Sequence, residues 1–250
     1  MGRTPAASQP ATARVCAVIV AGGMGRRFGG DTPKQYRLLA GVPLVVHSLR
    51  AFDGCEAIDR IVLVVPAGDV SRVATSLLPA AGLVKPVQLA AGGASRQESV
   101  FNGLEHVPEG VSIVAIHDAV RPLVTGACIA ACIEGARCHG ACIAALPAWD
   151  TLKRVGPGGS IRETLPRDLL WMAQTPQTFE LGLIRAAHAA ARRTGWTGTD
   201  DAELVERIGA PVHVVPGSRF NFKITTIDDF HAAEMLLDRT AVFPLTAPSG

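Results

Sequence analysis

A glycine-rich loop with basic side chains is the segment of this sequence best suited to chemistry on phosphates. It reads Gly22-Gly23-Met24-Gly25-Arg26-Arg27-Phe28-Gly29-Gly30 and is followed by Pro33-Lys34-Gln35. Glycines let the backbone approach a ligand closely and turn amide groups toward an anion. The Arg and Lys side chains add fixed positive charge for polyphosphate oxygens. We therefore predict a polyphosphate site here, in preference to a flexible, solvated basic loop.

Two common nucleotide-binding motifs do not fit this loop. In the pattern Gly23-x-Gly25-x-x-Phe28, a phenylalanine stands where a dinucleotide fingerprint needs its third glycine. No Gly-Lys-Ser/Thr follows, so the loop is not a P-loop either. A basic loop suits a reaction that develops negative charge on phosphates better than it suits hydride transfer.

A second glycine pair, Gly92-Gly93, precedes another polar segment. Ser95 with Glu98 three residues later fits a capping box at the start of a helix. Capping accounts for these two residues and leaves Arg96 and Ser99 free for a ligand. The glycine pair itself could form the floor of a base pocket.

Asp118 follows the apolar run Ser112–Ile116 almost directly. A carboxylate at the end of a strand can hold a ribose hydroxyl, a metal ion or a metal-bound water. It could instead cap the next helix. A basic loop on the neighbouring strand favours the ligand role. The adjacent His117 is expected to be structural.

The elements that must position these residues alternate along the chain. Short apolar runs predict buried strands over Val15–Ala21, Ile61–Val65, Ser112–Ile116, Cys142–Ala145 and Val212–Val215. Helical spacing separates them over Pro43–Phe52, Val70–Leu78, Gln97–His106 and Gly126–Cys138. This rhythm predicts an α/β fold, a Rossmann-like, mainly parallel sheet flanked by helices. Ligands then bind beyond the carboxyl ends of the strands.

The interval 149–179 interrupts this rhythm. Asp150–Val155 and Ile161–Leu165, joined by Gly-Pro-Gly-Gly-Ser, predict a β-hairpin that projects as an arm. Such a hairpin either extends the edge of the sheet or reaches a partner. We expect a single domain over 15–239, with a disordered tail over 1–14 and a loose tail over 240–250.

Composition limits the class of protein. The chain has 250 residues, 48% of them apolar, and a net charge of 24 − 22 = +2. These values exclude disorder for most of the chain and give no general case for nucleic acid binding. No apolar run approaches the roughly 18 residues of a membrane helix. The amino-terminal segment lacks the apolar region of a secretory signal, which with reduced thiols predicts a cytoplasmic protein.

Four of the six cysteines cluster in the sequence, at Cys128, Cys132, Cys138 and Cys142. No pair of them forms the C-x-x-C spacing of common zinc sites. We therefore interpret them as structural thiols rather than metal ligands.

Taken together, these segments resemble the 2-C-methyl-D-erythritol 4-phosphate cytidylyltransferase family, which has the nucleotide-diphospho-sugar transferase fold. The resemblance extends from about Cys16 to Leu237. The matching segments are Ala21 to Arg27 with Pro33-Lys34-Gln35-Tyr36, Gly92-Gly93-x-x-Arg96-Gln97-x-Ser99-Val100, His117-Asp118-Ala119-x-Arg121-Pro122, Asp150-Thr151-x-Lys153, Leu170-Trp171, Gln174-Thr175-Pro176-Gln177, Thr199-Asp200-Asp201-Ala202 and Asn221-x-Lys223-Ile224-Thr225. The departures are small: Val120, Pro166 and Ile227 stand where the family usually has Ala, Asp and Pro.

The resemblance implies transfer of CMP from CTP to 2-C-methyl-D-erythritol 4-phosphate, with release of pyrophosphate. It implies that Arg27 and Lys34 stabilise the transition state, while Arg167 and Lys223 position the acceptor. The CTP-binding residues it implies are Ala21, Gly22, Gly23, Gly25, Gly92, Gly93, Arg96, Ser99 and Asp118. The acceptor-binding residues it implies are Asp118, Thr151, Arg167, Thr175, Thr199 and Lys223. It further implies Mg²⁺ held mainly through the CTP phosphates, and a homodimer formed through the arm.

Two other functions remain to be compared with this one. The first is a cytidylyltransferase for another polyol phosphate, such as ribitol 5-phosphate, on the same fold. The second is a non-catalytic nucleotide-binding module. The presence of Arg27, Lys34, Arg167 and Lys223 argues against the second, because a binder needs no charges at both reacting groups.

Overall fold

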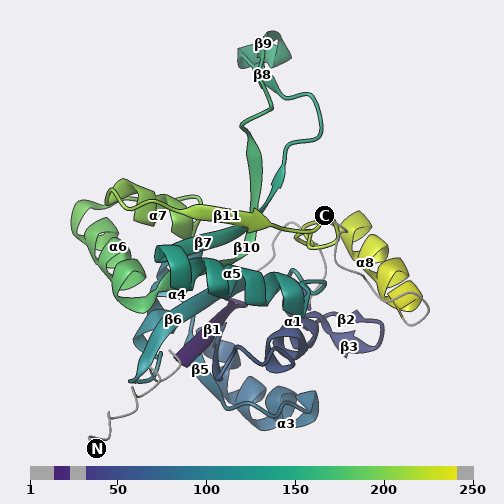
Figure 1. The fold of residues 1–250 in the computed structure, drawn as a ribbon. Helices are drawn as coiled ribbons and strands as arrows, with labels where there is room; N and C mark the ends of the chain where they lie inside the picture. The colour runs from purple at the N-terminus through teal and green to yellow at the C-terminus, as the bar shows by residue number, and fades with distance from the viewer. Residues whose placement is uncertain (1–13, 23–31, 241–250) are drawn as a thin grey trace, which may run out of the picture.

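A seven-stranded mixed sheet forms the centre of the computed structural model, which describes residues 14–22 and 32–240 (Figure 1). Its strand order is β11-β7-β10-β6-β1-β4-β5. The strands are β1 (Arg14–Val20), β4 (Arg60–Val65), β5 (Val87–Ala91), β6 (Val111–Asp118), β7 (Ala141–Pro147), β10 (Trp171–Glu180) and β11 (His213–Pro216). All neighbours pair in parallel except β10, which is antiparallel to β6 and β7. The predicted fold class is confirmed.

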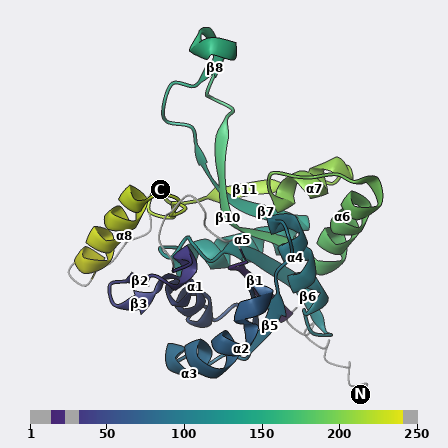
Figure 2. The ribbon, with the colours of Figure 1, turned by 180° about the vertical axis from the view of Figure 1, so that it is seen from behind.

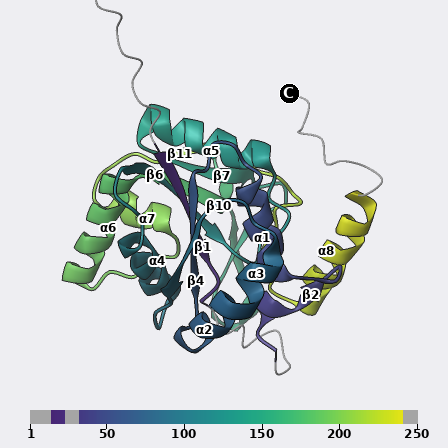
Figure 3. The same ribbon diagram turned by 90° about the horizontal axis from the view of Figure 1, so that it is seen from below.

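Helices cover both faces of the sheet (Figure 3). One face packs on α1 (Leu44–Asp53), α3 (Leu78–Ala81) and α5 (Gly126–His139), the other on α4 (Arg96–Glu105), α6 (Leu181–Thr194) and α7 (Asp201–Arg207). Strand β1 is continuously apolar because both of its faces are buried. Its side chains alternate between the hydrophobic cores on the two faces of the sheet, so that Ile19 packs in one core and Val18 in the other.

Shorter elements connect some of these strands and helices. They are η1 (Lys34–Tyr36), β2 (Leu38–Leu39), β3 (Val42–Pro43), η2 (Ala67–Asp69), α2 (Val70–Arg72) and the π-helical turn η3 (Val73–Leu77). The predicted helix over Val70–Leu78 is thus present as successive helical pieces. Within the described parts of the chain, no helix is both long and apolar enough to cross a membrane.

A separate small core supports the carboxyl-terminal helix α8 (Ile227–Thr240), which stands apart from the sheet (Figure 2). Phe230 of α8 packs there with Leu39 of β2, Leu44 of α1 and Ile224. This core fixes the segment just before α8, which carries Lys223.

The predicted hairpin is present and projects away from the sheet (Figure 1). Strands β8 (Lys153–Val155) and β9 (Ile161–Thr164) pair antiparallel around the turn η4 (Pro157–Gly159). Every residue of the two strands is exposed. Residues 171–179, which we had assigned to the arm, belong instead to β10 of the central sheet, where Gln177 pairs with Ile116 of β6. Among the main elements, strands β5 and β10 and helices α6, α7 and α8 were not predicted.

Candidate active site

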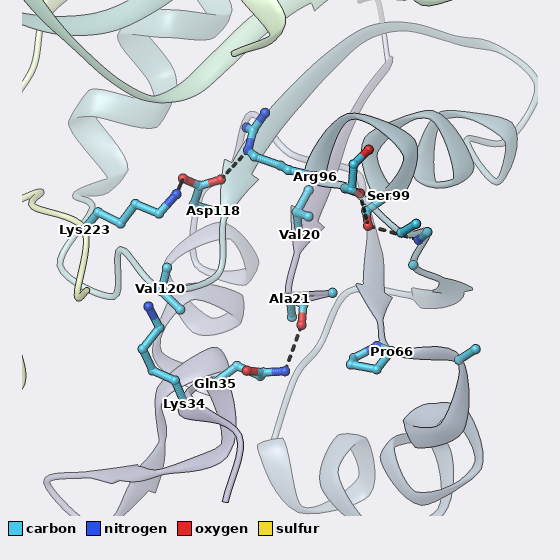
Figure 4. Close-up of a pocket in the computed structure, with 16 residues that line it drawn as sticks. Val20, Ala21, Lys34, Gln35, Pro66, Arg96, Ser99, Asp118, Val120 and Lys223 are labelled. Atoms are coloured by element: carbon cyan, nitrogen blue, oxygen red, sulfur yellow. Dashed lines mark hydrogen bonds and ion pairs between the residues drawn. The ribbon is translucent and has the colours of Figure 1, made fainter. Parts of the chain in front are cut away.

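A cavity of about 630 Å³ opens beyond the carboxyl ends of β1, β4, β5 and β6 (Figure 4). This is the place predicted from the strand rhythm. The residues that line it and that the sequence analysis had selected are Ala21, Gly22, Lys34, Gly92, Gly93, Arg96, Ser99, Asp118 and Lys223. Segments far apart in the sequence therefore meet at one site.

Gly22 and Gly92 allow the ends of β1 and β5 to pack against Ser99 of α4. A Cβ atom on Gly22 would lie 3.0 Å from Ser99 Oγ, and one on Gly92 would lie 3.2 Å from the same oxygen. Ser99 Oγ donates to the carbonyl of Ser95 (2.8 Å) and accepts from the amide of Gly93 (3.1 Å). Ser99 therefore shapes the cavity wall, and because it lines the cavity its contact with the nucleotide stays a prediction.

The start of α4 is capped as its sequence predicts, with a shift of one residue. Ser95 Oγ accepts from the amide of Glu98 (3.0 Å). Glu98 Oε2 accepts from the amide of Ala94 (2.8 Å) rather than from that of Ser95. The cap fixes the first turn of the helix, from which Arg96 reaches the cavity.

Four charged side chains of alternating sign form a chain that runs from the cavity to the buried Asp201. Lys223 Nζ lies 2.9 Å from Asp118 Oδ2, and Arg96 Nε lies 2.9 Å from Asp118 Oδ1. The same guanidinium reaches Asp201 Oδ2 through Nη1 (2.8 Å). Burial alone would raise the pKa of Asp118, but Arg96 and Lys223 hold it well below its ordinary value. Asp118 is therefore ionised at neutral pH and is a poor proton acceptor.

His117 and Thr175 lie beneath Asp118 as a buried hydrogen-bonded pair. His117 Nε2 lies 3.2 Å from the carbonyl of Arg121, to which it can only donate. In the neutral ring Nδ1 is then the acceptor, and it takes the Thr175 Oγ1 proton (2.9 Å). Thr175 Oγ1 in turn accepts from the Asp118 amide (3.2 Å). Burial lowers the pKa of His117 to about 4, so the ring stays neutral, and the structural role predicted for it fits.

Two lysines approach the cavity from one side, opposite Ser99 (Figure 4). Lys34, on η1, donates to the carbonyl of Ile224 (2.5 Å), one residue beyond Lys223. Its neighbour Gln35 donates to the carbonyl of Ala21 (3.0 Å), which ties η1 to the end of β1. Together with Arg96, the two lysines give the described cavity lining three cationic side chains, which suit the binding of anions.

Over residues 15–239 the chain matches the model of the IspD family, 2-C-methyl-D-erythritol 4-phosphate cytidylyltransferase. The chain belongs to this family. A relative of that name from Syntrophus aciditrophicus is 47% identical over 226 residues, covering 90% of this chain and 97% of the relative. Another from Symbiobacterium thermophilum is 44% identical, covering 91% and 94%.

Solved structures agree with this membership. The 2-C-methyl-D-erythritol 4-phosphate cytidylyltransferase of Thermus thermophilus is 32% identical, with a TM-score of 0.72 over 90% of this chain and 99% of that one. A 4-diphosphocytidyl-2C-methyl-D-erythritol synthase from Anaerococcus prevotii reaches a TM-score of 0.80 at 27% identity, covering 91% and 97%. This chain is accordingly a nucleotidyltransferase of the cytidylyltransferase family.

Other residues selected for this cytidylyltransferase do not line the cavity. Arg167 lies in the arm region, exposed, and donates to the carbonyl of Trp149 (2.5 Å). Thr151 is exposed near the base of the arm, and exposed Thr199 donates to Glu203 Oε2 (2.9 Å). Thr175 lies in β10 behind Asp118. Gly23, Gly25 and Arg27 lie outside the described residues.

In the described part of the cavity lining, the carboxylates do not form a cluster for a metal. Among the residues the structure describes, no group of three or more His, Cys, Asp or Glu side chains could hold a metal ion. Asp118 is the one acidic side chain in the described lining, and both of its oxygens face cations.

Of the clustered cysteines, Cys138 is exposed and the others are buried. Burial raises the pKa of Cys142 to about 11, which keeps that thiol protonated.

The residue that sequence reasoning missed is Asp201. It is buried on the first turn of α7, whose amino terminus is clamped by Gln177 of β10: Gln177 Oε1 accepts from the amide of Asp201 (3.0 Å). The motif Thr199-Asp200-Asp201-Ala202 was the available signal. It marks the start of a helix at an Asp cap, but it does not show that the second Asp meets Arg96 across 105 positions.

Proposed function

We propose that this chain transfers CMP from CTP to the phosphate of 2-C-methyl-D-erythritol 4-phosphate. The products are 4-CDP-2-C-methyl-D-erythritol, a precursor in non-mevalonate isoprenoid biosynthesis, and pyrophosphate. The observation that carries the proposal is the cavity itself. In a chain of this family, it joins a closely packed glycine wall to Asp118, Arg96, Lys34 and Lys223.

Positioning and charge stabilisation carry this reaction. The acceptor is a phosphomonoester with a second pKa near 6, so it is largely dianionic at neutral pH and needs no general base. The surroundings agree with this, because Asp118 is strongly acidic and His117 is neutral, buried and fully engaged. The difficulty is the approach of one polyanion to another. Lys34 and Arg27 would offset charge at the α-phosphate and the leaving pyrophosphate, while Lys223 and Arg167 hold the acceptor.

The donor set near the cavity fits Mg²⁺ bound chiefly by CTP. Mg²⁺ commonly keeps several waters and binds through substrate phosphates with one or two carboxylates. Asp118 is the carboxylate that the described lining offers. For Asp118 to bind Mg²⁺ directly through Oδ2, Lys223 would have to move away from that oxygen. When bound, the ion neutralises charge on the phosphate oxygens.

We further propose a homodimer formed through the arm, in the cytoplasm. The cavity carries Lys223, whereas Arg167 and Thr151 lie in the arm region outside it. The arm strands are exposed throughout, including Val155 and Ile161. A two-fold dimer would complete each acceptor site from the body of one chain and the arm of the other.

Pyrophosphate release tests the proposed activity. Purified chain, CTP and Mg²⁺ are mixed with 2-C-methyl-D-erythritol 4-phosphate or with ribitol 5-phosphate at equal concentrations. We expect rapid release with the first acceptor and little with the second. Preference for ribitol 5-phosphate would assign the chain to a different acceptor, and no release with either would support a non-catalytic nucleotide-binding module.

A further inference from the structure

Asp201 is a buried carboxylate whose position no helix cap explains. Its exposed fraction is 1%. The cap of α7 is supplied by its neighbour Asp200, whose Oδ1 accepts from the amide of Glu203 (2.9 Å). The backbone amide of Asp201 is already satisfied by Gln177. A buried charge is costly unless it is paired, so the partners of this side chain must account for it.

Those partners lie on both sides of the Asp201 side chain. Oδ2 accepts from Arg96 Nη1 at 2.8 Å, and Oδ1 lies 3.4 Å from Nε2 of His188, which is also buried. Arg96 uses Nε for Asp118 and Nη1 for Asp201, so its planar guanidinium is held at two points. If only one carboxylate bound the guanidinium group of Arg96, the group could still rotate about that contact.

Hydrogen bonds from the central sheet hold the start of α7, where Asp201 lies. Gln177 projects from β10 of the central sheet and binds three groups at the start of α7. Its Oε1 accepts from the amides of Asp201 (3.0 Å) and Ala202 (3.1 Å), and its Nε2 donates to Asp200 Oδ2 (2.8 Å). The helix start is thereby fixed to the sheet that also carries Asp118.

From this geometry we infer that Asp201 is a positioning residue for the nucleotide site: it aligns Arg96, and through Arg96 it aligns Asp118, for the binding of CTP. The inference rests on the proposed function, since it concerns the same reaction and the same cavity. Asp201 itself does not line the cavity, so it acts through Arg96 rather than on the nucleotide.

Substitution of Asp201 by Asn tests this in the full-length chain. D201N keeps the size of the side chain and removes the charge that orients the guanidinium. We expect the KM for CTP to rise about tenfold, the scale of losing one hydrogen bond to a charged group. The kcat should change less than threefold, and the KM for the acceptor less than twofold. A purely structural role would lower the amount of active enzyme without this selective change in the CTP KM.

D228N is the matched control, because it makes the same chemical change on the first turn of another helix, α8. Asp228 is exposed and does not line the cavity. Its kinetic constants should stay within twofold of those of the wild type. The activities of the wild type and of D228N also test the proposed function separately: if both are inactive with CTP and acceptor, the function fails before the role of Asp201 is at issue.

A double-mutant cycle with R96K identifies the route of the effect. Lys keeps the charge but cannot span both carboxylates as the guanidinium does. In the R96K background, D201N should change the CTP KM by less than threefold. Additive effects of the two substitutions would overturn the inference, as would a CTP KM for D201N within twofold of wild type. If D201N does not fold, D201E is measured instead, and a CTP KM shifted by less than twofold there overturns the inference too.

Discussion

Two parts of the molecule carry the side chains we assign to the reaction, and they differ in what surrounds them. At the cavity, the side chain of Asp118 is 9% exposed and is held by Arg96 and Lys223. In the arm, the ion pair of Arg154 with Glu163 (2.6 Å) joins side chains that are 64% and 49% exposed. The first group is built into the sheet, whereas the second stands in solvent.

This difference in burial indicates which part can hold its geometry within one chain. The cavity is assembled from the ends of β1, β4, β5 and β6, so its geometry is set by the core of a single chain. A two-stranded hairpin with no buried residue is marginally stable by itself. We therefore expect the cavity to be preorganised and the arm to need a second surface, which the proposed homodimer would provide.

The largest expected effect lies in the cavity, at Lys34. Replacement by Ala removes a cation that would stabilise charge developing on the triphosphate. We expect K34A to lower kcat by about 100-fold or more, and the affinity for CTP much less. Steady-state kinetics at saturating acceptor measure both. A normal kcat with only a raised KM for CTP would assign Lys34 to ground-state binding instead.

The second prediction tests whether arm and cavity cooperate between chains. R167A and K223A should each be nearly inactive. When the two are unfolded together and refolded, random pairing makes about half of the dimers hybrid. In a crossed-arm hybrid one site has both residues intact and the other has neither, so roughly a quarter of wild-type activity should return.

Mass spectrometry of the refolded mixture supplies the control, because it shows directly whether hybrid dimers are present. If hybrids form and activity stays at the level of the separate variants, each site takes both residues from one chain. The shared site would then be wrong, although the activity itself would stand.

A third prediction compares the two ion-paired regions in stability. D118N leaves Arg96 and Lys223 without their shared carboxylate, and breaking a buried pair in this way costs about 3 kcal/mol. E163Q breaks the exposed pair with Arg154 and should cost less than about 0.5 kcal/mol. Urea denaturation at neutral pH measures both. Equal losses would mean that the cavity charges are no better held than those of the arm.

Acidification should reduce the loss of stability that D118N causes. In the folded chain the pKa of Asp118 lies well below its ordinary value: burial opposes this, but Arg96 and Lys223 outweigh it. As the pH falls below about 4, the unfolded chain takes up a proton at Asp118 that the folded chain does not. The stability that Asp118 contributes is therefore complete at pH 7 and declines in acid. Denaturation of the wild type and D118N at pH 7 and pH 3 should show the gap between them narrowing.

The sequence predicted most of the cavity because its residues follow directly after strands. Gly22 and Asp118 could be placed at the sheet edge because each follows a predicted apolar run, whereas β5, the strand before Gly92, was not predicted. Most of strand β10 lies in the interval that was assigned to the arm, and the strand contains Pro176, a residue type that is rare in central strands. The structure accommodates this proline where the register with β7 is irregular, between Ala173 and Gln177.

The buried polar partners could not be predicted in the same way. Arg96 carries a helix-start pattern that is complete without Asp201, and Thr175 gives no sign in the sequence that its hydroxyl meets His117. Such contacts depend on the packing of distant elements, which local periodicity does not encode. The exposed arm, by contrast, was visible from its glycines and prolines, because a solvated hairpin depends on local turn chemistry.

The smallest effects are expected at the clustered cysteines, which belong to neither region. Cys138 is exposed at the end of α5, whereas Cys142 is buried in β7. The sulfur of Cys142 packs closely against Gly135 of α5: a Cβ atom on that glycine would lie only 2.4 Å from it. C138S and C142S should both keep kcat within about twofold of wild type, since neither thiol lines the cavity. C142S should lose about 1 kcal/mol of stability, because it buries a hydroxyl in an apolar site, and C138S should lose almost none. Metal analysis of the purified protein completes the test: we expect no stoichiometric zinc, and one tightly bound zinc per chain, lost on substitution of these cysteines, would make them ligands rather than packing residues.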